Sequence, residues 1–96
     1  MIPFALHLNG SVLNLTLAGE VTIEHVRALA DELKASLLPG YTLAVEAAQL
    51  TRLDAAGLQV LLSAAQTASN TSLIASSPAW ANAFSRYASP DPFQTL

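Results

Sequence analysis

The segment from residue 53 to 62 is the part of this sequence whose residue types and spacing most clearly indicate a site. Asp54 precedes two small residues, a glycine and the run 58–62, which has the spacing of an amphipathic helix. Asp54 is therefore placed to cap this helix. A helix start leaves unpaired N–H groups and a positive dipole end, which favour anions and close contact with a partner. Ala55 and Ala56 carry no hydroxyl, so they supply no nucleophile.

Catalytic chemistry has little support elsewhere in the chain. His7 lies in an alternating segment and His25 near a helix start, and neither has neighbours at a metal-ligand spacing. The sequence contains no G-x-S-x-G, no P-loop, no G-x-G-x-x-G and no cysteine. The many serines lack a marked base and orienting acid. We therefore expect no enzyme, no metal site and no cofactor.

Composition narrows the classes of partner. The chain has 96 residues, which indicates a single domain over 1–96. Charged residues are 11% of it, the net charge is −3, and Lys and Arg together number four, so a nucleic-acid footprint is not expected. No apolar stretch approaches the roughly 18 residues of a membrane span, and residues 1–4 do not resemble a signal peptide. We expect a soluble, cytoplasmic protein without direct membrane insertion.

The periodicity of apolar residues predicts the elements that must position the 53–62 segment. Alternation predicts strands over 2–8 and 13–17, joined by a two-residue turn at Asn9-Gly10, with the second strand stopping near Ala18-Gly19. Helical spacing follows from Ile23 to Leu37, where Thr22 can act as the N-cap. Pro39-Gly40 ends this helix.

The second half of the chain repeats the pattern of strand and helix. A strand is predicted over 41–47, the second helix carries the 58–65 apolar positions, and a short strand follows at 73–75. Ser77-Pro78 then caps a third helix, on which Trp80, Ala83, Phe84 and Tyr87 form one core stripe before a short tail at Phe93. The order ββαβαβα predicts an α/β domain: a mixed four- to five-stranded sheet, with helices packed mainly on one face.

An ordered set of segments resembles the STAS family, the sulfate transporter and anti-sigma-factor antagonist domains. Residues 17–22 (LAGEVT) are similar to the family's turn between the second strand and the first helix. Residues 43–50 are similar to the strand that enters the family signature, and Ser77-Pro78-Ala79 to the start of its last helix. The signature itself is similar to Asp54-Ala55-Ala56-Gly57-Leu58. The resemblance spans nearly the whole chain and implies the STAS fold.

The resemblance also implies a regulatory role without catalysis. In many members of the family, a partner kinase phosphorylates the hydroxyl residue just before the glycine of the signature. The equivalent of that phosphosite here is Ala56, which cannot be phosphorylated. The implied function is a protein-binding module whose switch is missing at this position.

The predicted partner-binding surface is the start of the second helix and its adjoining face. No charged side chain occurs from Ala55 to Asn70, whereas a solvated helix face normally carries charges. The residues assigned to this surface are Arg52, Asp54, Ala55, Ala56, Gly57, Leu58, Gln59 and Ser63.

Three of these residues have alternatives. Asp54 is a cap and also a candidate edge of the interface. Gly57 allows close approach either of a partner or of a neighbouring loop of the domain. Arg52 pairs either with an acidic partner or with Glu46 or Asp54 of the chain itself.

The resemblance leaves more than one class of partner open. The first is an anti-sigma factor kinase or another signalling protein. The alternative is the ATPase of a phospholipid-transport ATP-binding-cassette complex, because small stand-alone STAS subunits of those complexes also have Asp-small-Ala-Gly-Leu at the second helix. A third hypothesis is an anion or nucleotide at the start of that helix. A homodimer is also open.

Overall fold

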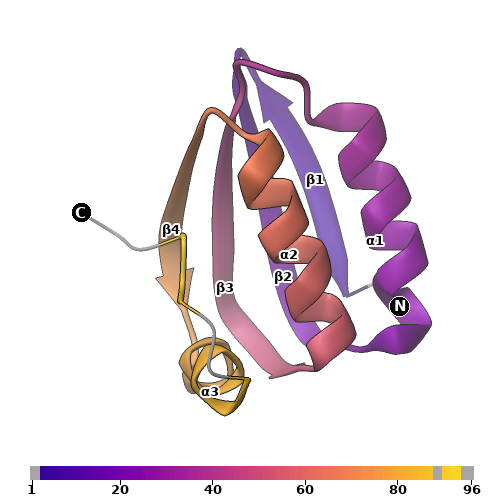
Figure 1. Ribbon diagram of the computed structural model, residues 1–96, viewed down its shortest axis with the longest axis vertical. Helices are drawn as coiled ribbons and strands as arrows, with labels where there is room; N and C mark the ends of the chain where they lie inside the picture. Colours follow the sequence, from indigo (N-terminus) through magenta and orange to yellow (C-terminus); the bar gives the residue numbers. More distant parts are fainter. Residues whose placement is uncertain (1–2, 88–89, 94–96) are drawn as a thin grey trace.

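The computed structural model describes residues 3–87 and 90–93, which form four strands and three helices in the order ββαβαβα, as predicted. Helices and strands alternate after the first hairpin (Figure 1). The elements are β1 (Phe4–Asn9), β2 (Val12–Val21), α1 (Ile23–Ser36), β3 (Thr42–Leu53), α2 (Ala55–Thr67), β4 (Asn70–Ser76) and α3 (Pro78–Arg86).

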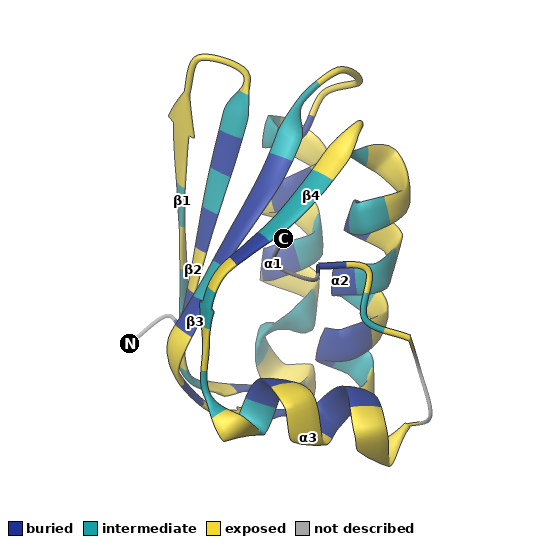
Figure 2. Ribbon diagram, turned by 90° about the vertical axis from the view of Figure 1, so that its left-hand side faces the viewer, coloured by how far each residue is buried: buried dark blue, intermediate teal, exposed yellow. Residues whose placement is uncertain are grey.

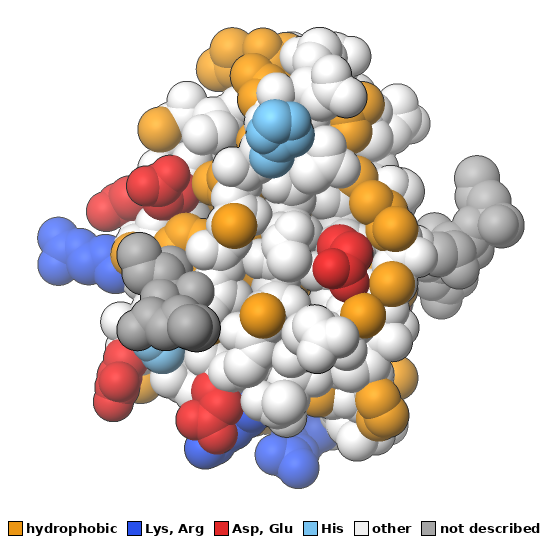
Figure 3. Space-filling view, turned by 180° about the vertical axis from the view of Figure 1, so that it is seen from behind, with side chains coloured by type: hydrophobic (Ala, Val, Ile, Leu, Met, Phe, Trp, Pro, Cys, Tyr) orange, Lys and Arg blue, Asp and Glu red, His pale blue; other side chains and the backbone are white. Residues whose placement is uncertain are grey.

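The four strands form one mixed sheet in the order β1-β2-β3-β4. β1 pairs with β2 antiparallel, and the β2–β3 and β3–β4 pairs are parallel, which confirms the predicted pairing. α1 and α2 lie side by side on one face of the sheet, and α3 lies across its end, against β3 (Figures 1 and 2). Among the described residues, no helix covers the opposite face of the sheet (Figure 2). Figure 3 shows the molecule from that side, where hydrophobic side chains are scattered among polar ones.

The first hairpin and the end of β2 differ from the prediction. Asn9 pairs with Val12, so the turn residues are Gly10 and Ser11, one position later than predicted. β2 continues to Val21 instead of stopping near Gly19. Gly19 has a φ of +77°, and the register with β3 shifts between residues 16 and 18 and again between 19 and 20. This bulged extension brings the end of β2 to the start of α2.

The core lies between the sheet and the two parallel helices, where dark blue residues gather in Figure 2. Alternate residues of the strands face the helices, and cross-strand pairs such as Leu15 with Val45 are completely buried. α1 contributes Leu29 and Leu33. Most core positions are leucines, which matches the leucine-rich periodicity of the sequence.

Residues 90–93 return to the domain, and Phe93 enters the core instead of forming part of a free tail. Phe93 is fully buried, and its ring meets Trp80 edge-on with centroids 5.6 Å apart. The Asp91 carboxylate accepts hydrogen bonds from Trp80 Nε1 and from the Phe93 N–H, each at 2.8 Å. Phe84 completes the cluster, whereas Tyr87 is 39% exposed, so its predicted place on the buried stripe is wrong.

Two predicted helix caps also have different roles in the structure. Thr22 and Ser77 occupy the N-cap positions of α1 and α3, but neither side chain bonds to its own helix. The Ser77 hydroxyl donates to the Leu50 carbonyl instead, which ties the start of α3 to β3. Pro78 takes the first helical position, as predicted.

Candidate functional site

Asp54 holds the starts of α1 and α2 together. Its Oδ1 accepts a hydrogen bond from the Gly57 N–H at 2.9 Å, which confirms the predicted cap of α2. Its Oδ2 accepts one from the Ile23 N–H, also at 2.9 Å, so the same carboxylate serves α1 in place of the Thr22 hydroxyl. The Asp54 N–H donates to the Val21 carbonyl at 3.3 Å. Each carboxylate oxygen is thus already engaged by a backbone N–H of the domain itself.

Packing within the domain explains Gly57. A Cβ on this buried residue would lie 2.7 Å from Leu53 Cδ1 and 3.3 Å from both Val21 Cγ1 and the Val21 carbonyl oxygen. The Leu53 side chain and the end of β2 thus occupy the space beside the first turn of α2, and a side chain at position 57 would have to displace Leu53 Cδ1. Of the two alternatives for Gly57, the structure supports contact with a neighbouring segment of the domain.

Leu58 does not belong to the surface to which it was assigned. It is 1% exposed and lies in the core under α2. The cause is helical spacing, because Leu58, Leu61 and Ala64 all project towards the sheet.

The exposed positions at the start of α2 carry small or uncharged side chains. Ala55 and Gln59 are exposed and Ala56 is partly exposed. Ile23, which the sequence analysis did not assign to the site, is 74% exposed, and its N–H bonds to the residue that precedes Ala55. We call the surface formed by Ile23, Asp54, Ala55, Ala56 and Gln59 the helix-start surface.

Arg52 lies at the edge of the site and forms no ion pair with an acidic residue of the described part of the chain. It is exposed on β3, and its neighbour in the register is Glu20 of β2. The Asp54 oxygens accept backbone N–H groups, and Glu46 Oε1 accepts the Ala48 N–H at 2.7 Å. Within residues 3–87 and 90–93 no ion pair joins Arg52 to either acid, so the pairing within the chain that was considered for it does not form.

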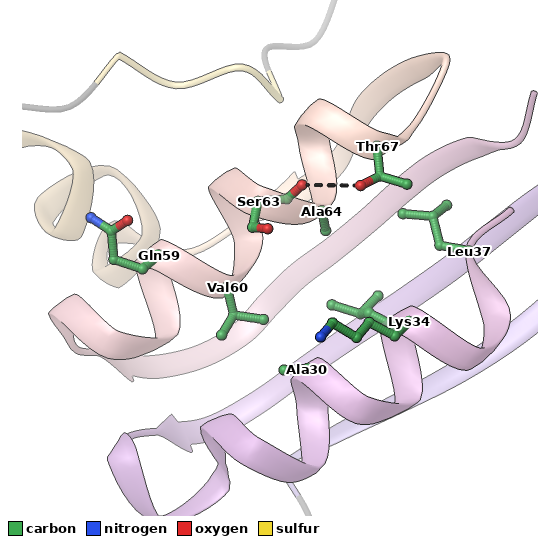
Figure 4. Close-up of a pocket in the computed structure, with 9 residues that line it drawn as sticks. Ala30, Lys34, Leu37, Gln59, Val60, Ser63, Ala64 and Thr67 are labelled. Carbon is green, nitrogen blue, oxygen red and sulfur yellow. Dashed lines mark hydrogen bonds between the residues drawn. The ribbon is translucent and has the colours of Figure 1, made fainter. Parts of the chain in front are cut away.

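A groove of about 350 Å³ runs between α1 and α2, and it begins beside the helix-start surface. Ala30, Lys34 and Leu37 line it from α1 (Figure 4). Gln59 and Ser63, two of the predicted partner-binding residues, line it from α2. We call this depression the α1–α2 groove.

The two histidines lie on different elements of the fold. His7 is exposed on β1 and points to the face of the sheet that has no helix. His25 lies in the first turn of α1, and its Nδ1 is buried without a hydrogen-bond partner in the described part of the chain. Among those same residues, no three His, Asp or Glu side chains are grouped so that they could hold a metal ion.

None of the helices in the described residues is both long enough and apolar enough to cross a membrane.

The sequence and the fold were compared with known proteins. The family model described as "Mlab, STAS domain" matches residues 4–88, which is most of the chain. The chain belongs to the STAS domain family. No curated protein is significantly similar to this STAS domain.

Solved structures share its fold at low sequence identity. The crystal structure of an anti-sigma factor antagonist from Mycobacterium paratuberculosis superposes with a TM-score of 0.73 at 16% identity, covering 88% of this chain and 76% of that one. The anti-sigma factor antagonist SpoIIAA in its unphosphorylated form gives a TM-score of 0.71 at 16% identity, covering 97% of this chain and 87% of that one. The predicted STAS fold is therefore confirmed.

Proposed function

We propose that this STAS domain is a non-catalytic regulatory module that binds a protein partner through the helix-start surface and the adjoining face of α2. The carrying observation is an exposed helix start on which apolar and neutral side chains predominate. Ile23 is 74% exposed beside Asp54, and α2 has no charged side chain from Ala55 to Thr67. Apolar and neutral residues of this kind lose little on desolvation when a partner covers them.

The second part of the proposal is that binding is not switched at position 56. Ala56 immediately precedes Gly57 and is partly exposed, as a modification site must be, but it has no hydroxyl. One structural neighbour is an anti-sigma factor antagonist described in its unphosphorylated form, so phosphorylation belongs to the states of that protein. In this chain, binding is constitutive, or it is controlled by the partner, by a ligand or by the expression level of the protein. A phosphate would add about −1.5 to −2 charge at such a surface.

Affinity purification from the native host, followed by mass spectrometry, tests the interface. The wild type is compared with Ala56→Asp, which places a carboxylate in the first turn of α2, where the helix dipole tolerates it. Ala81→Asp is the matched control, because it makes the same change at an exposed position of α3. We expect a partner that Ala81→Asp retains and Ala56→Asp loses. Equal recovery with both variants would contradict the interface.

The missing switch has its own test. Ala56→Ser restores a hydroxyl at the proposed position, so a cognate kinase should phosphorylate this variant and not the wild type. Thr51 on β3 and Ser63 on α2 are nearby hydroxyl residues in the sequence. Phosphate on either of them in the wild-type protein would overturn the constitutive interpretation.

The identity of the recovered proteins separates two contexts. A kinase, sigma-factor regulator or other signalling protein is the partner that this proposal expects, in line with the fold shared with anti-sigma factor antagonists. The alternative, a phospholipid-transport complex, is favoured by the order Asp54-Ala55-Ala56-Gly57-Leu58, which resembles the STAS subunits of such complexes. Recovery of an ATPase together with a permease would establish that alternative.

A further inference from the structure

The α1–α2 groove has a narrow apolar floor and walls of small or neutral residues. Leu33, Leu37 and Ala64 line it but are each less than 10% exposed, so the apolar strip at its bottom is thin. Ala30 on α1 and Ser63 on α2 have short side chains, so the two walls of the groove are low at these positions. The groove follows α1 from residue 30 to 37, a length of about 10 Å, or two helical turns.

The charge that lines the groove is positive and lies on its α1 wall. Lys34 is the charged residue among those that line it, and its side chain extends over the groove between Ala30 and Val60 (Figure 4). Arg27 is seven residues earlier on α1, which places it on the same side of the helix two turns away. Within the described residues no ion pair engages either cation. The α2 wall contributes no charge of either sign.

The acidic residues of α1 lie farther from the groove. Helical spacing places Glu24 and Asp31 on the stripe just outside Arg27 and Lys34, and Glu32 on the far side of the helix. The rim of the groove therefore carries one charge, the Lys34 ammonium, beside an apolar strip, and this combination complements an occupant that is apolar on one face and acidic beside it.

We propose that the α1–α2 groove docks an acidic amphipathic helix of the protein partner. The occupant's aliphatic side chains at positions i, i+3 or i+4, and i+7 span the two turns of the groove, and an acidic side chain beside them meets Lys34. The inference rests on the proposed function, because the groove adjoins the helix-start surface and its occupant belongs to the same protein partner.

The shape of the groove favours a helix over a small amphipathic anion. A small-molecule pocket usually encloses most of its ligand's surface. Here the floor residues are nearly buried, while Gln59, Ser63 and Thr67 of the α2 wall are exposed. Most of the surface available for contact is therefore on the two rims. A helix is wide enough to touch both rims at once, whereas a single acyl chain is not.

A displayed library of helical peptides, selected on the complete chain, tests this inference without assuming the partner's identity. The best peptide is titrated into isotope-labelled protein, and its dissociation constant is measured for the wild type and three variants. Lys34→Glu reverses the rim charge, and Ala30→Leu fills the groove without changing charge. Arg86→Glu on α3 is the control, since it makes the same charge change away from the groove.

We expect the selected peptides to be acidic and amphipathic, and their amide shifts to cluster at residues 27–37 and 59–67. Lys34→Glu should weaken binding about five- to tenfold. Ala30→Leu should weaken it at least as much while keeping the wild-type melting temperature, and Arg86→Glu should stay within about twofold.

Several results would overturn the inference: basic peptides, shifts on the helix-free face of the sheet, equal losses in Lys34→Glu and Arg86→Glu, or a library that yields no binder. None of them affects the Ala56→Asp comparison with the native partner. If that comparison fails instead, the helix-start surface is excluded while the recognition chemistry of the groove still stands.

Discussion

Removal of the Asp54 carboxylate should destabilise the domain more than loss of an ordinary helix cap, because two helix starts depend on it. Replacing an N-cap Asp by Ala costs about 1 kcal/mol, which here is the bond from the Gly57 N–H at 2.9 Å. The second bond, from the more exposed Ile23 N–H, adds about 0.5–1 kcal/mol. We therefore expect Asp54→Ala to lower the free energy of unfolding by about 1.5–2 kcal/mol. In a domain of this size, that corresponds to about 6–16 °C in melting temperature.

Urea unfolding followed by circular dichroism measures this loss. Asp54→Asn keeps one acceptor oxygen and should lose about half as much. Asp31→Ala is the control, since it removes an exposed carboxylate from the middle of α1 and should change stability by less than about 0.5 kcal/mol. If Asp54→Ala is no more harmful than Asp31→Ala, the carboxylate does not hold the two helix starts together.

Two further predictions concern packing beneath the site and at the C-terminus. Gly57→Ala should lower the free energy of unfolding by about 1 kcal/mol in spite of alanine's higher helix propensity, because the new Cβ would lie 2.7 Å from Leu53 Cδ1. Urea unfolding measures this loss. A gain in stability would show that the contact relaxes freely. Phe93→Ala should cost about 3 kcal/mol and shift the emission of Trp80, the single tryptophan, to longer wavelength. Wild-type stability and emission would contradict the buried position of Phe93.

Local patterns predict most of this fold because its core is built from regular elements. Alternating leucines mark β2, and their partners in β3, such as Val45 beside Leu15, follow the same period. The continuation of β2 past Gly19 was not predictable, since a glycine ordinarily marks the end of a strand. In the structure, its positive φ of +77° lets the strand continue through a bulge.

Contacts between distant residues account for the other differences. Asp54 bonds the N–H of Ile23, 31 positions earlier, and Ser77 donates to a carbonyl 27 positions earlier. Local sequence identifies both as cap residues, but it does not predict a hydrogen-bond partner so distant in the sequence. Phe93 is similar, because two nearby prolines mark the end of regular structure and give no indication that the next aromatic ring returns to the core.

The candidate site was predictable where helical spacing decides exposure. Gln59 and Ser63 are exposed and reach the α1–α2 groove, as positions opposite the apolar stripe should. Leu58 was assigned to the surface although its spacing with Leu61 already indicates the core. Ile23 was missed because only the Asp54 bridge brings it to the site.

The most direct test of the partner-binding surface is amide hydrogen exchange of this chain, free and in complex with the partner recovered from its host. Our account predicts slower exchange in the complex over residues 54–63 and at the start of α1, with α3 and the edge strand β1 unchanged. Protection confined to α3 or β1, with residues 54–63 exchanging as in the free protein, would contradict it.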